Sequence, residues 1–171
     1  SIRRQRQMCI RDRYIGTGFG NAIYINGQII EGKHGVAGEL GHIPVLRSKE
    51  VCSCGNTGCI EMHASGKALK NISKENFPET DIDNIFMEHG DTRIIQDFID
   101  ALAIPIATEI NILDPDYIII AGGVPIMKGF PIDRLKKAIY EKARKPYPAE
   151  DMNIIISNHD QKSGILGAAY Y

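Results

Sequence analysis

The chain has 171 residues, of which 43% are hydrophobic and 24% are charged, and its formal net charge is −1. This length and composition suit one globular domain with its own apolar core. A net charge this close to zero gives no reason to expect nucleic acid as a partner. No apolar run approaches the roughly 20 residues of a membrane-spanning helix. Because no targeting segment is recognised either, we expect a cytoplasmic protein without a membrane partner.

The first 13 residues differ from the rest of the chain. They contain five arginines and one aspartate, a net charge of +4, and they lack apolar periodicity of either kind. One interpretation is a basic arm that binds nucleic acid. The other is a non-native leader, such as translated adapter sequence at the end of an assembled fragment. We prefer the leader and exclude residues 1–13 from the fold, which implies that the chain begins in mid-protein with an upstream part missing.

Short strands are predicted at the start of the remaining chain. Residues 14–25 are expected to form a strand, a glycine turn and a second strand. Asn26 and Gly27 form a strong signal for a two-residue hairpin turn. Residues 28–32 then return as a third strand. A loop and a cysteine-containing segment follow, and a short capped helix is expected from Ser65.

Helices and buried strands alternate in the second half of the chain. Residues 91–113 carry apolar side chains at helical spacing. Asp91 is the expected N-cap, and Pro105 is expected to kink or interrupt the helix. Residues 71–84 are polar and rich in turn-forming residues. The further elements are a buried strand at 117–121, an amphipathic helix at 131–144, a buried strand at 153–157 and a small helix at 163–171.

The order of these elements indicates the fold class. A hairpin-linked start gives antiparallel pairing, whereas strands that alternate with helices imply parallel pairing. The sequence therefore predicts an α/β protein with a mixed sheet on which helices pack. It contains no internal repeat and no low-complexity segment.

Three cysteines lie within eight residues of one another, and one histidine precedes them. Cys52 and Cys54 are too close to pair comfortably with each other, and no secretory context supports a disulfide framework. Together with Cys59 and His42 they supply three thiols and an imidazole, a standard ligand set for structural zinc. The glycines between them allow the tight loop that turns the sulfurs inward. The alternative is three unrelated loop thiols, but clustered cysteines favour a zinc-binding loop.

Two glycine-rich segments follow predicted strands. In the first, glycine N–H groups and a threonine hydroxyl can approach a phosphate, and a simple glycine-rich hairpin is the alternative. In the second, Gly122 and Gly123 leave room for the adenosine part of a nucleotide, or form a tight strand-to-helix turn. The residues of the first segment are Gly16, Thr17, Gly18 and Gly20.

Four segments in order connect the chain to a known family. The sequences GTGFG, HGVAGELGHIPV, CSCGNTGCIE and INILDPDYIIIAGGV resemble the ROK family of sugar kinases and repressors. This resemblance implies the C-terminal lobe of an actin-like ATPase (RNase H-like) fold over residues 14–171, with a zinc-binding loop. Within the family, the second segment and residues 114–131 are most like the allose kinases.

The resemblance also implies a function for the full-length protein. It implies ATP-dependent phosphorylation of a hexose, with Mg²⁺ offsetting the phosphate charge, by a protein that forms a homodimer. It assigns structural zinc to the three cysteines and His42, the hexose to Glu39, His42 and Glu61, and the nucleotide to the two glycine segments. The general-base aspartate and the other phosphate loop of the family lie upstream of this chain. We therefore expect no catalytic residue within it and no kinase activity of its own.

Two other functions are alternatives. One is the sugar-sensing lobe of a ROK repressor, whose helix-turn-helix would also lie upstream. The other is a zinc-stabilised oligomerisation module that binds no ligand. The intact Glu39, His42 and Glu61 weigh against the module, and the segments that resemble allose kinases favour the kinase over the repressor.

Overall fold

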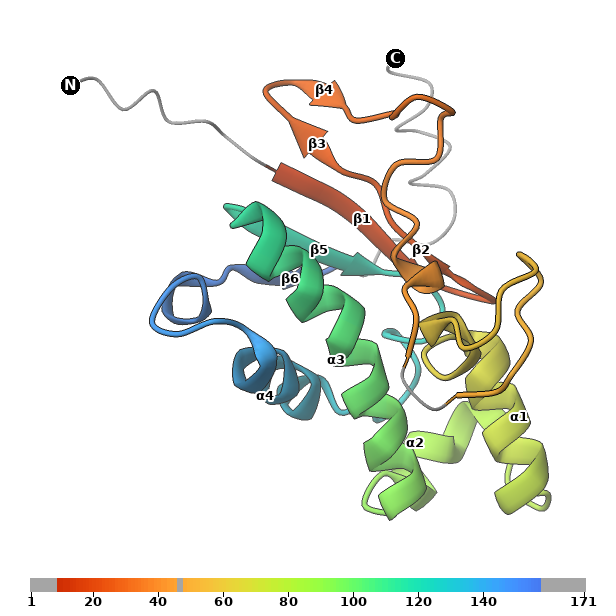
Figure 1. The fold of residues 1–171 in the computed structure, drawn as a ribbon. Helices are drawn as coiled ribbons and strands as arrows, with labels where there is room; N and C mark the ends of the chain where they lie inside the picture. Colours follow the sequence, from red (N-terminus) through yellow and green to blue (C-terminus); the bar gives the residue numbers. More distant parts are fainter. Residues whose placement is uncertain (1–8, 46–47, 158–171) are drawn as a thin grey trace.

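A computed structural model of the chain describes residues 9–45 and 48–157 (Figure 1). Residues 1–8 and the small helix expected at 163–171 lie outside this described part. The strands are β1 (Cys9–Ile15), β2 (Phe19–Gly20), β3 (Tyr24–Ile25), β4 (Gln28–Ile29), β5 (Tyr117–Ala121) and β6 (Ile154–Ile156). The α-helices are α1 (Gly66–Asn76), α2 (Ile85–His89), α3 (Arg93–Leu113) and α4 (Ile132–Lys142). The 3₁₀ helices are η1 (Leu40–His42), η2 (Ile60–Met62), η3 (Ile82–Asn84) and η4 (Ala149–Asp151).

A mixed sheet with the strand order β2-β1-β5-β6 forms one layer of the molecule. β1 pairs antiparallel with β2, whereas β5 pairs parallel with both β1 and β6. β3 and β4 form a separate antiparallel hairpin, with positive φ at Asn26 and Gly27. This arrangement confirms the predicted α/β class, the mixed sheet and the position of the hairpin turn.

The position of β1 corrects the boundary expected after residue 13. The strand begins at Cys9 and lies inside the sheet, between β2 and β5, with Ile10 opposite Ile118. The exclusion of residues 9–13 from the fold is therefore wrong. Arginines occupy part of this strand, and its register against β5 is irregular between Ile10 and Arg13. For this reason the segment shows no two-residue apolar period from which a strand could be predicted.

α3 contributes the longest run of buried side chains, with Leu102 and Ile106 fully buried. The expected N-cap of this helix is wrong, because the N-cap residue is Thr92 and not Asp91. Of the two effects expected at Pro105, the interruption does not occur, since the helix continues through this residue. Pro105 lacks the N–H group for one helical hydrogen bond. Burial of the apolar face along the whole helix outweighs that loss, because tertiary packing supplies most helix stability in proteins.

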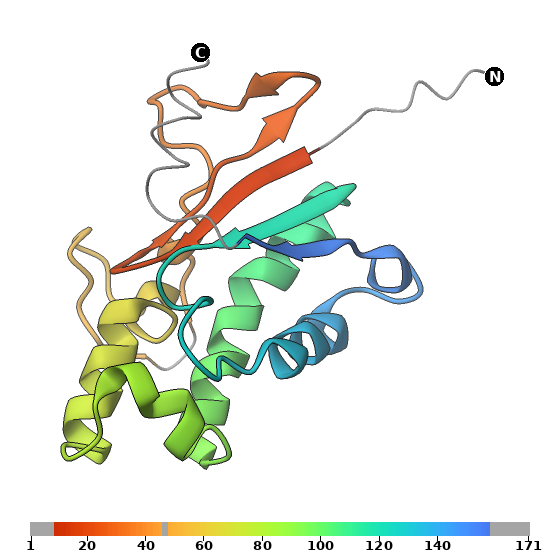
Figure 2. The same cartoon turned by 180° about the vertical axis from the view of Figure 1, so that it is seen from behind.

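The helices α3 and α4 pack against each other on one face of the main sheet, as the two opposite views in Figures 1 and 2 show. α4 and β5 lie where a helix and a buried strand are expected, and β6 lies at the expected position but is partly exposed. Residues 71–84 are more helical than expected, since they include the end of α1 and all of η3. No described helix combines the length and apolar character that crossing a membrane requires.

Candidate functional site

The cysteine segment folds back against residues 43–45 and forms a compact loop. The N–H of Val45 donates a hydrogen bond to the carbonyl oxygen of Gly58 at 2.7 Å, and the N–H of Ile60 donates to that of Ile43 at 2.9 Å. Gly58 has a φ of +82°, a conformation that side chains other than glycine rarely adopt. These contacts return the chain to the residues that directly follow His42.

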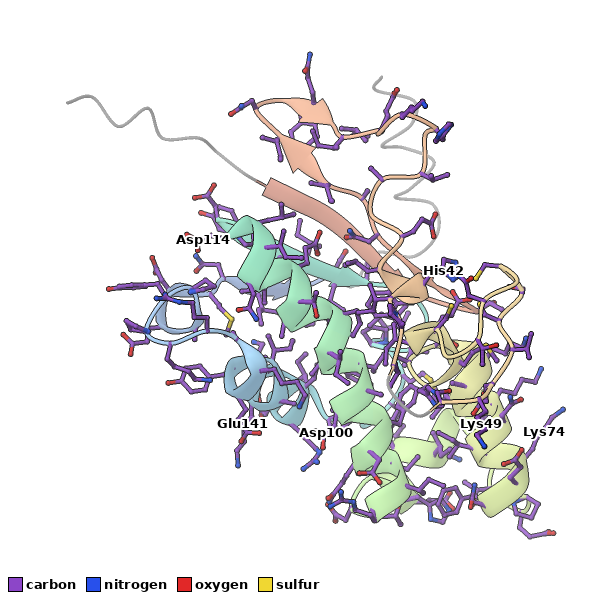
Figure 3. All side chains as sticks on the ribbon, in the orientation of Figure 1. His42, Lys49, Lys74, Asp100, Asp114 and Glu141 are labelled. Carbon is purple, nitrogen blue, oxygen red and sulfur yellow. The ribbon has the colours of Figure 1, made fainter. Side chains whose placement is uncertain are left out.

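The four candidate metal ligands meet within this loop. The ligand atoms of His42, Cys52, Cys54 and Cys59 all lie within 4.8 Å of one another, and Figure 3 labels His42 beside the loop. His42 Nδ1 is 3.5 Å from Cys52 Sγ, and Cys54 Sγ is 3.6 Å from Cys59 Sγ. A tetrahedral ion with Zn–S bonds of about 2.3 Å holds its ligand atoms roughly 3.5–3.8 Å apart. The chemistry of the donor set and these two distances are therefore compatible with zinc.

The thiols of this cluster differ in how readily they lose a proton. A hydrogen bond from the backbone of Cys54, against the opposing effect of burial, lowers the pKa of the Cys52 thiol to about 7. Burial, with smaller effects of the neighbouring thiols, raises the pKa of the Cys59 thiol to about 12. A metal ion therefore has to displace the proton of Cys59 when it binds, whereas Cys52 offers a thiolate near neutral pH.

The three candidate sugar-binding side chains have different surroundings. Glu39 is exposed, and its Oε2 lies 3.5 Å from His42 Nε2. Because His42 Nδ1 faces Cys52, the imidazole lies between the cysteine cluster and the Glu39 carboxylate. Glu61 is partly buried, and its Oε2 accepts a hydrogen bond from the N–H of Phe19 at 2.9 Å. Only part of its hydrogen-bonding capacity is therefore open to another donor.

Glu61 also connects the cysteine segment to the GTGFG segment. A Cβ atom at Gly18 would lie 2.6 Å from Glu61 Oε2, so a side chain there would displace the Glu61 carboxylate from this position. The first turn of α1 holds the same segment, because the N–H of Gly66 donates to the carbonyl oxygen of Gly16 at 2.7 Å. The glycine turn is thus fixed between a carboxyl group and a helix.

Both glycine segments contribute to one cavity of about 550 Å³. Gly16 and Thr17 line it together with Gly123. Gly122 does not line it, since this residue is buried with a φ of +111°, and a Cβ there would lie 2.5 Å from the carbonyl oxygen of Ile15. Gly18 and Gly20 are not among its lining residues either. The other residues that line it are Gly66, Lys67, Leu69, Lys70, Ile82, Asp83, Val124 and Met127.

Lys67, Lys70 and Asp83 are charged residues of this cavity that sequence reasoning missed. The two lysines lie three residues apart on α1, on neighbouring turns of the same face. An exposed lysine on a helix carries no sequence signal, so only the contact between α1 and the GTGFG segment identifies them. A larger cavity of about 850 Å³, between α4 and β6, contains none of the expected site residues.

Comparison with curated proteins places this geometry in a family. Residues 5–171 match the model of the ROK family. The chain is 31% identical over 163 residues to an N-acetylmannosamine kinase of Vibrio cholerae serotype O1, an alignment that covers 91% of this chain and 54% of that protein. The chain therefore spans about half the length of the curated relatives it matches.

Solved structures of two kinds resemble this fold. A ROK family glucokinase from Streptomyces griseus, in complex with glucose and AMPPNP, matches with a TM-score of 0.75 and 26% identity, over 96% of this chain and 59% of that chain. A ROK family transcriptional regulator, a homologue of the E. coli MLC protein, matches with a TM-score of 0.74 and 28% identity, over 96% and 44% of the two chains. Since the family model covers almost the whole sequence, this chain belongs to the ROK family.

Proposed function

We propose that this chain is the sugar- and nucleotide-binding C-terminal lobe of an ATP-dependent hexose kinase. One arrangement supports this function most directly: the GTGFG segment lies between the Glu61 carboxyl group and the cavity that also contains Gly123. A single glycine turn can therefore approach a hexose on one side and phosphates on the other. Phosphoryl transfer depends on such positioning of the two reactants.

In the proposed hexose site, Glu39 and Glu61 accept hydrogen bonds from sugar hydroxyls. One carboxylate can accept from two adjacent hydroxyls, which suits a hexose. Zinc bound by His42 and the three cysteines has four protein ligands and no open position, so its contribution is structural. It orients the His42 ring, whose Nε2 faces Glu39, and in this way it fixes the geometry of the sugar site.

In the proposed nucleotide site, Gly16 and Thr17 offer backbone N–H groups and a hydroxyl to a phosphate. Lys67 and Lys70 add positive charge, and Gly123 leaves room on the adenosine side. Mg²⁺ accompanies the nucleotide, and no residue of this chain is assigned to it. The general base and the other phosphate loop are assigned to the upstream part of a longer protein.

The segments that resemble allose kinases favour D-allose as the hexose. The relative from Vibrio cholerae is an N-acetylmannosamine kinase, and the solved glucokinase from Streptomyces griseus is in complex with glucose. These two sugars therefore belong in the same test. We expect the full-length protein to act as a homodimer in the cytoplasm, where ATP is available.

The change Glu39→Ala in the full-length protein tests the sugar site. We expect it to abolish hexose binding, measured by calorimetry with D-allose, D-glucose and N-acetylmannosamine. Zinc content should stay unchanged, because Glu39 is not a proposed metal ligand. Glu31→Ala is the matched control, since it removes the same charge from an exposed position eight residues earlier. Unchanged sugar affinity after Glu39→Ala would count against the assignment.

The chain by itself should not phosphorylate any sugar. Loss of a general base alone lowers the rate about 10²–10⁴-fold, and the missing phosphate loop lowers it further. An assay of ADP release with the purified chain and the three sugars measures this. Sugar-dependent turnover would show that the catalytic residues lie within the chain after all.

The sugar-sensing lobe of a repressor is the second candidate, and the match to a transcriptional regulator favours it. The sequence upstream of this chain separates the two functions. A DxGxT phosphate motif there would indicate the kinase, whereas a helix-turn-helix would indicate the repressor.

A further inference from the structure

A buried carboxyl group in the C-terminal part of α3 has no role in the functions described above. Glu109 is 2% exposed and lies among the apolar buried residues of this helix. Burial of a carboxyl group is unfavourable unless hydrogen bonds satisfy it. Among its interactions, Glu109 Oε1 accepts a hydrogen bond from Asn21 Nδ2 at 2.9 Å, across 88 residues of sequence. α3 is therefore hydrogen-bonded to Asn21, the residue that directly follows β2.

The orientation of the Asn21 carboxamide depends on this hydrogen bond. Its Oδ1 is buried and has no hydrogen-bond partner within the described part of the chain. A buried oxygen without a partner is unfavourable, so it persists only where other contacts fix the group. The bond to Glu109 and the surrounding packing are what hold the carboxamide in place.

Asn21 packs directly against the loop that carries the proposed sugar ligands. A Cβ atom at Gly38 would lie 3.0 Å from Asn21 Nδ2 and 3.1 Å from the Asn21 carbonyl oxygen. Gly38 has a φ of +90°, and its carbonyl oxygen accepts a hydrogen bond from the N–H of Leu40 at 2.7 Å. The direction in which the chain leaves Gly38 towards Glu39 is therefore set at the contact with Asn21.

A second close contact lies on the other side of Glu39. A Cβ atom at Gly41 would lie 2.8 Å from the carbonyl oxygen of Phe19 in β2. Residues 38–42 thus rest on a surface made by β2 and Asn21. The ladder between β1 and β2 holds one part of this surface, and Glu109 holds the other.

We infer that Asn21 and Glu109 form a positioning pair that fixes residues 38–42 and, through Glu39, sets the affinity for the sugar. The link to the sugar rests on the function proposed above. Neither residue is assigned to contact the sugar, since the pair acts through Gly38. Loosening it displaces Glu39 from the orientation in which it meets a hydroxyl, so the sugar should bind more weakly while the nucleotide site is unaffected.

The change Asn21→Ala in the full-length protein tests the pair by amide hydrogen exchange. We expect amides of residues 38–42 to exchange about fivefold faster, as for the loss of one ordinary hydrogen bond. Asn111→Ala is the matched control. Asn111 lies on α3, as Glu109 does. Its side chain donates a hydrogen bond to the carbonyl oxygen of Lys142 at 3.3 Å and accepts one from the N–H of Arg144 at 2.7 Å. This control removes two hydrogen bonds of an asparagine but should leave residues 38–42 unchanged.

Steady-state kinetics distinguish a failure of the positioning pair from a failure of the proposed sugar site. With D-allose, D-glucose and N-acetylmannosamine as probes, we expect Asn21→Ala to raise KM for the accepted sugar about tenfold. KM for ATP should not change. Unaltered exchange of residues 38–42 would overturn the inference. Faster exchange with an unchanged sugar KM would uphold the pair and remove Glu39 from the sugar site.

A second pair of variants applies if Asn21→Ala does not fold. Gly38→Ala introduces a side chain that presses on Asn21, whereas Gly35→Ala, at a φ of +71°, meets nothing within 4 Å. Both variants carry the backbone strain of a positive φ. We expect a larger rise in sugar KM for Gly38→Ala, and equal effects of the two changes would overturn the inference.

Discussion

The loops around the candidate zinc site and the helical layer of α3 and α4 are stabilised in different ways. The helical layer buries many large apolar side chains, including Phe98, Leu102 and Leu135. Within the described residues 38–45 and 48–61, the loops bury few such side chains, and Ile60 is the large apolar one that is fully buried. Their shape comes from backbone hydrogen bonds, glycine turns and the cysteine–histidine cluster. The loops should therefore depend on the metal, whereas the helical layer should not.

The largest effect is expected from the change Cys59→Ser, which tests the first half of this comparison. Zinc binding at structural sites contributes on the order of 10 kcal/mol to the folded form. We therefore expect the variant to retain little zinc and residues 38–61 to lose their protection from exchange and proteolysis. The amides of α3 should stay protected. Metal analysis and hydrogen exchange of protein purified without chelator measure both.

Ser53→Ala is the control for this change, because it alters an exposed residue of the same loop that is not a ligand. It should leave zinc content and exchange as they are. Zinc content near zero in the unaltered protein, with the loop still protected, would contradict the proposed metal site.

The change Leu102→Ala tests the second half of the comparison. Leu102 is fully buried, and truncating a buried leucine lowers the free energy of unfolding by about 2–5 kcal/mol. Ile112→Ala, on the same helix at a position that is 71% exposed, should lower it by less than about 0.5 kcal/mol. Urea unfolding followed by circular dichroism measures both. Similar losses for the two variants would mean that α3 is not the centre of the core.

The same contrast explains which parts of the fold could be predicted from the sequence. The elements of the helical layer carry apolar side chains at regular spacing, so their positions are predictable, and Asn26 and Gly27 mark the hairpin turn. β1 could not be predicted, because arginines and the register irregularity hide its period. The continuity of α3 through Pro105 depends on packing against distant residues, which local rules do not contain.

The residues of the candidate site also divide into those that the sequence identifies and those that only the fold identifies. Cys52, Cys54, Cys59 and His42 can be grouped from the sequence, because few chemical environments other than a metal site gather those residue types. Lys67 and Lys70 are ordinary helix-surface residues until the fold places α1 beside the GTGFG segment. Asn21 and Glu109 lie 88 residues apart, and nothing in either residue type indicates the other.

The change Gly122→Ala tests the turn at the end of β5, where the main sheet meets the proposed nucleotide cavity. Gly122 has a φ of +111°, and a Cβ there would lie 2.5 Å from a backbone oxygen of β1, so neither backbone strain nor contact can be avoided. We expect the free energy of unfolding to fall by about 1–3 kcal/mol. Gly123→Ala, where a Cβ meets nothing within 4 Å, should have a much smaller effect. Equal melting temperatures of the two variants would contradict this account of the turn.

The smallest expected effect comes from a change of pH, which should alter the zinc affinity of the candidate zinc site but not the packing of the helical layer. Burial raises the pKa of the Cys59 thiol to about 12, so zinc binding has to release its proton. The pKa of Cys52 is lowered to about 7, and this thiol has lost most of its proton at pH 8. Since zinc and protons compete, a fall in pH weakens the apparent zinc affinity by about tenfold per pH unit for each proton released.

We therefore expect zinc to bind at least about tenfold more weakly at pH 7 than at pH 8, as measured by competition with a chelator. The dependence should become steeper as the pH approaches 7, because Cys52 then takes up a proton that zinc must also displace. Burial of Leu102 involves no proton, so the loss of unfolding free energy caused by Leu102→Ala should be the same at the two pH values. Equal zinc affinity at the two pH values would show that the Cys59 proton is not released on binding. That result would mean either that Cys59 is not a ligand or that its thiol is already deprotonated before zinc binds, and the zinc content of Cys59→Ser distinguishes the two.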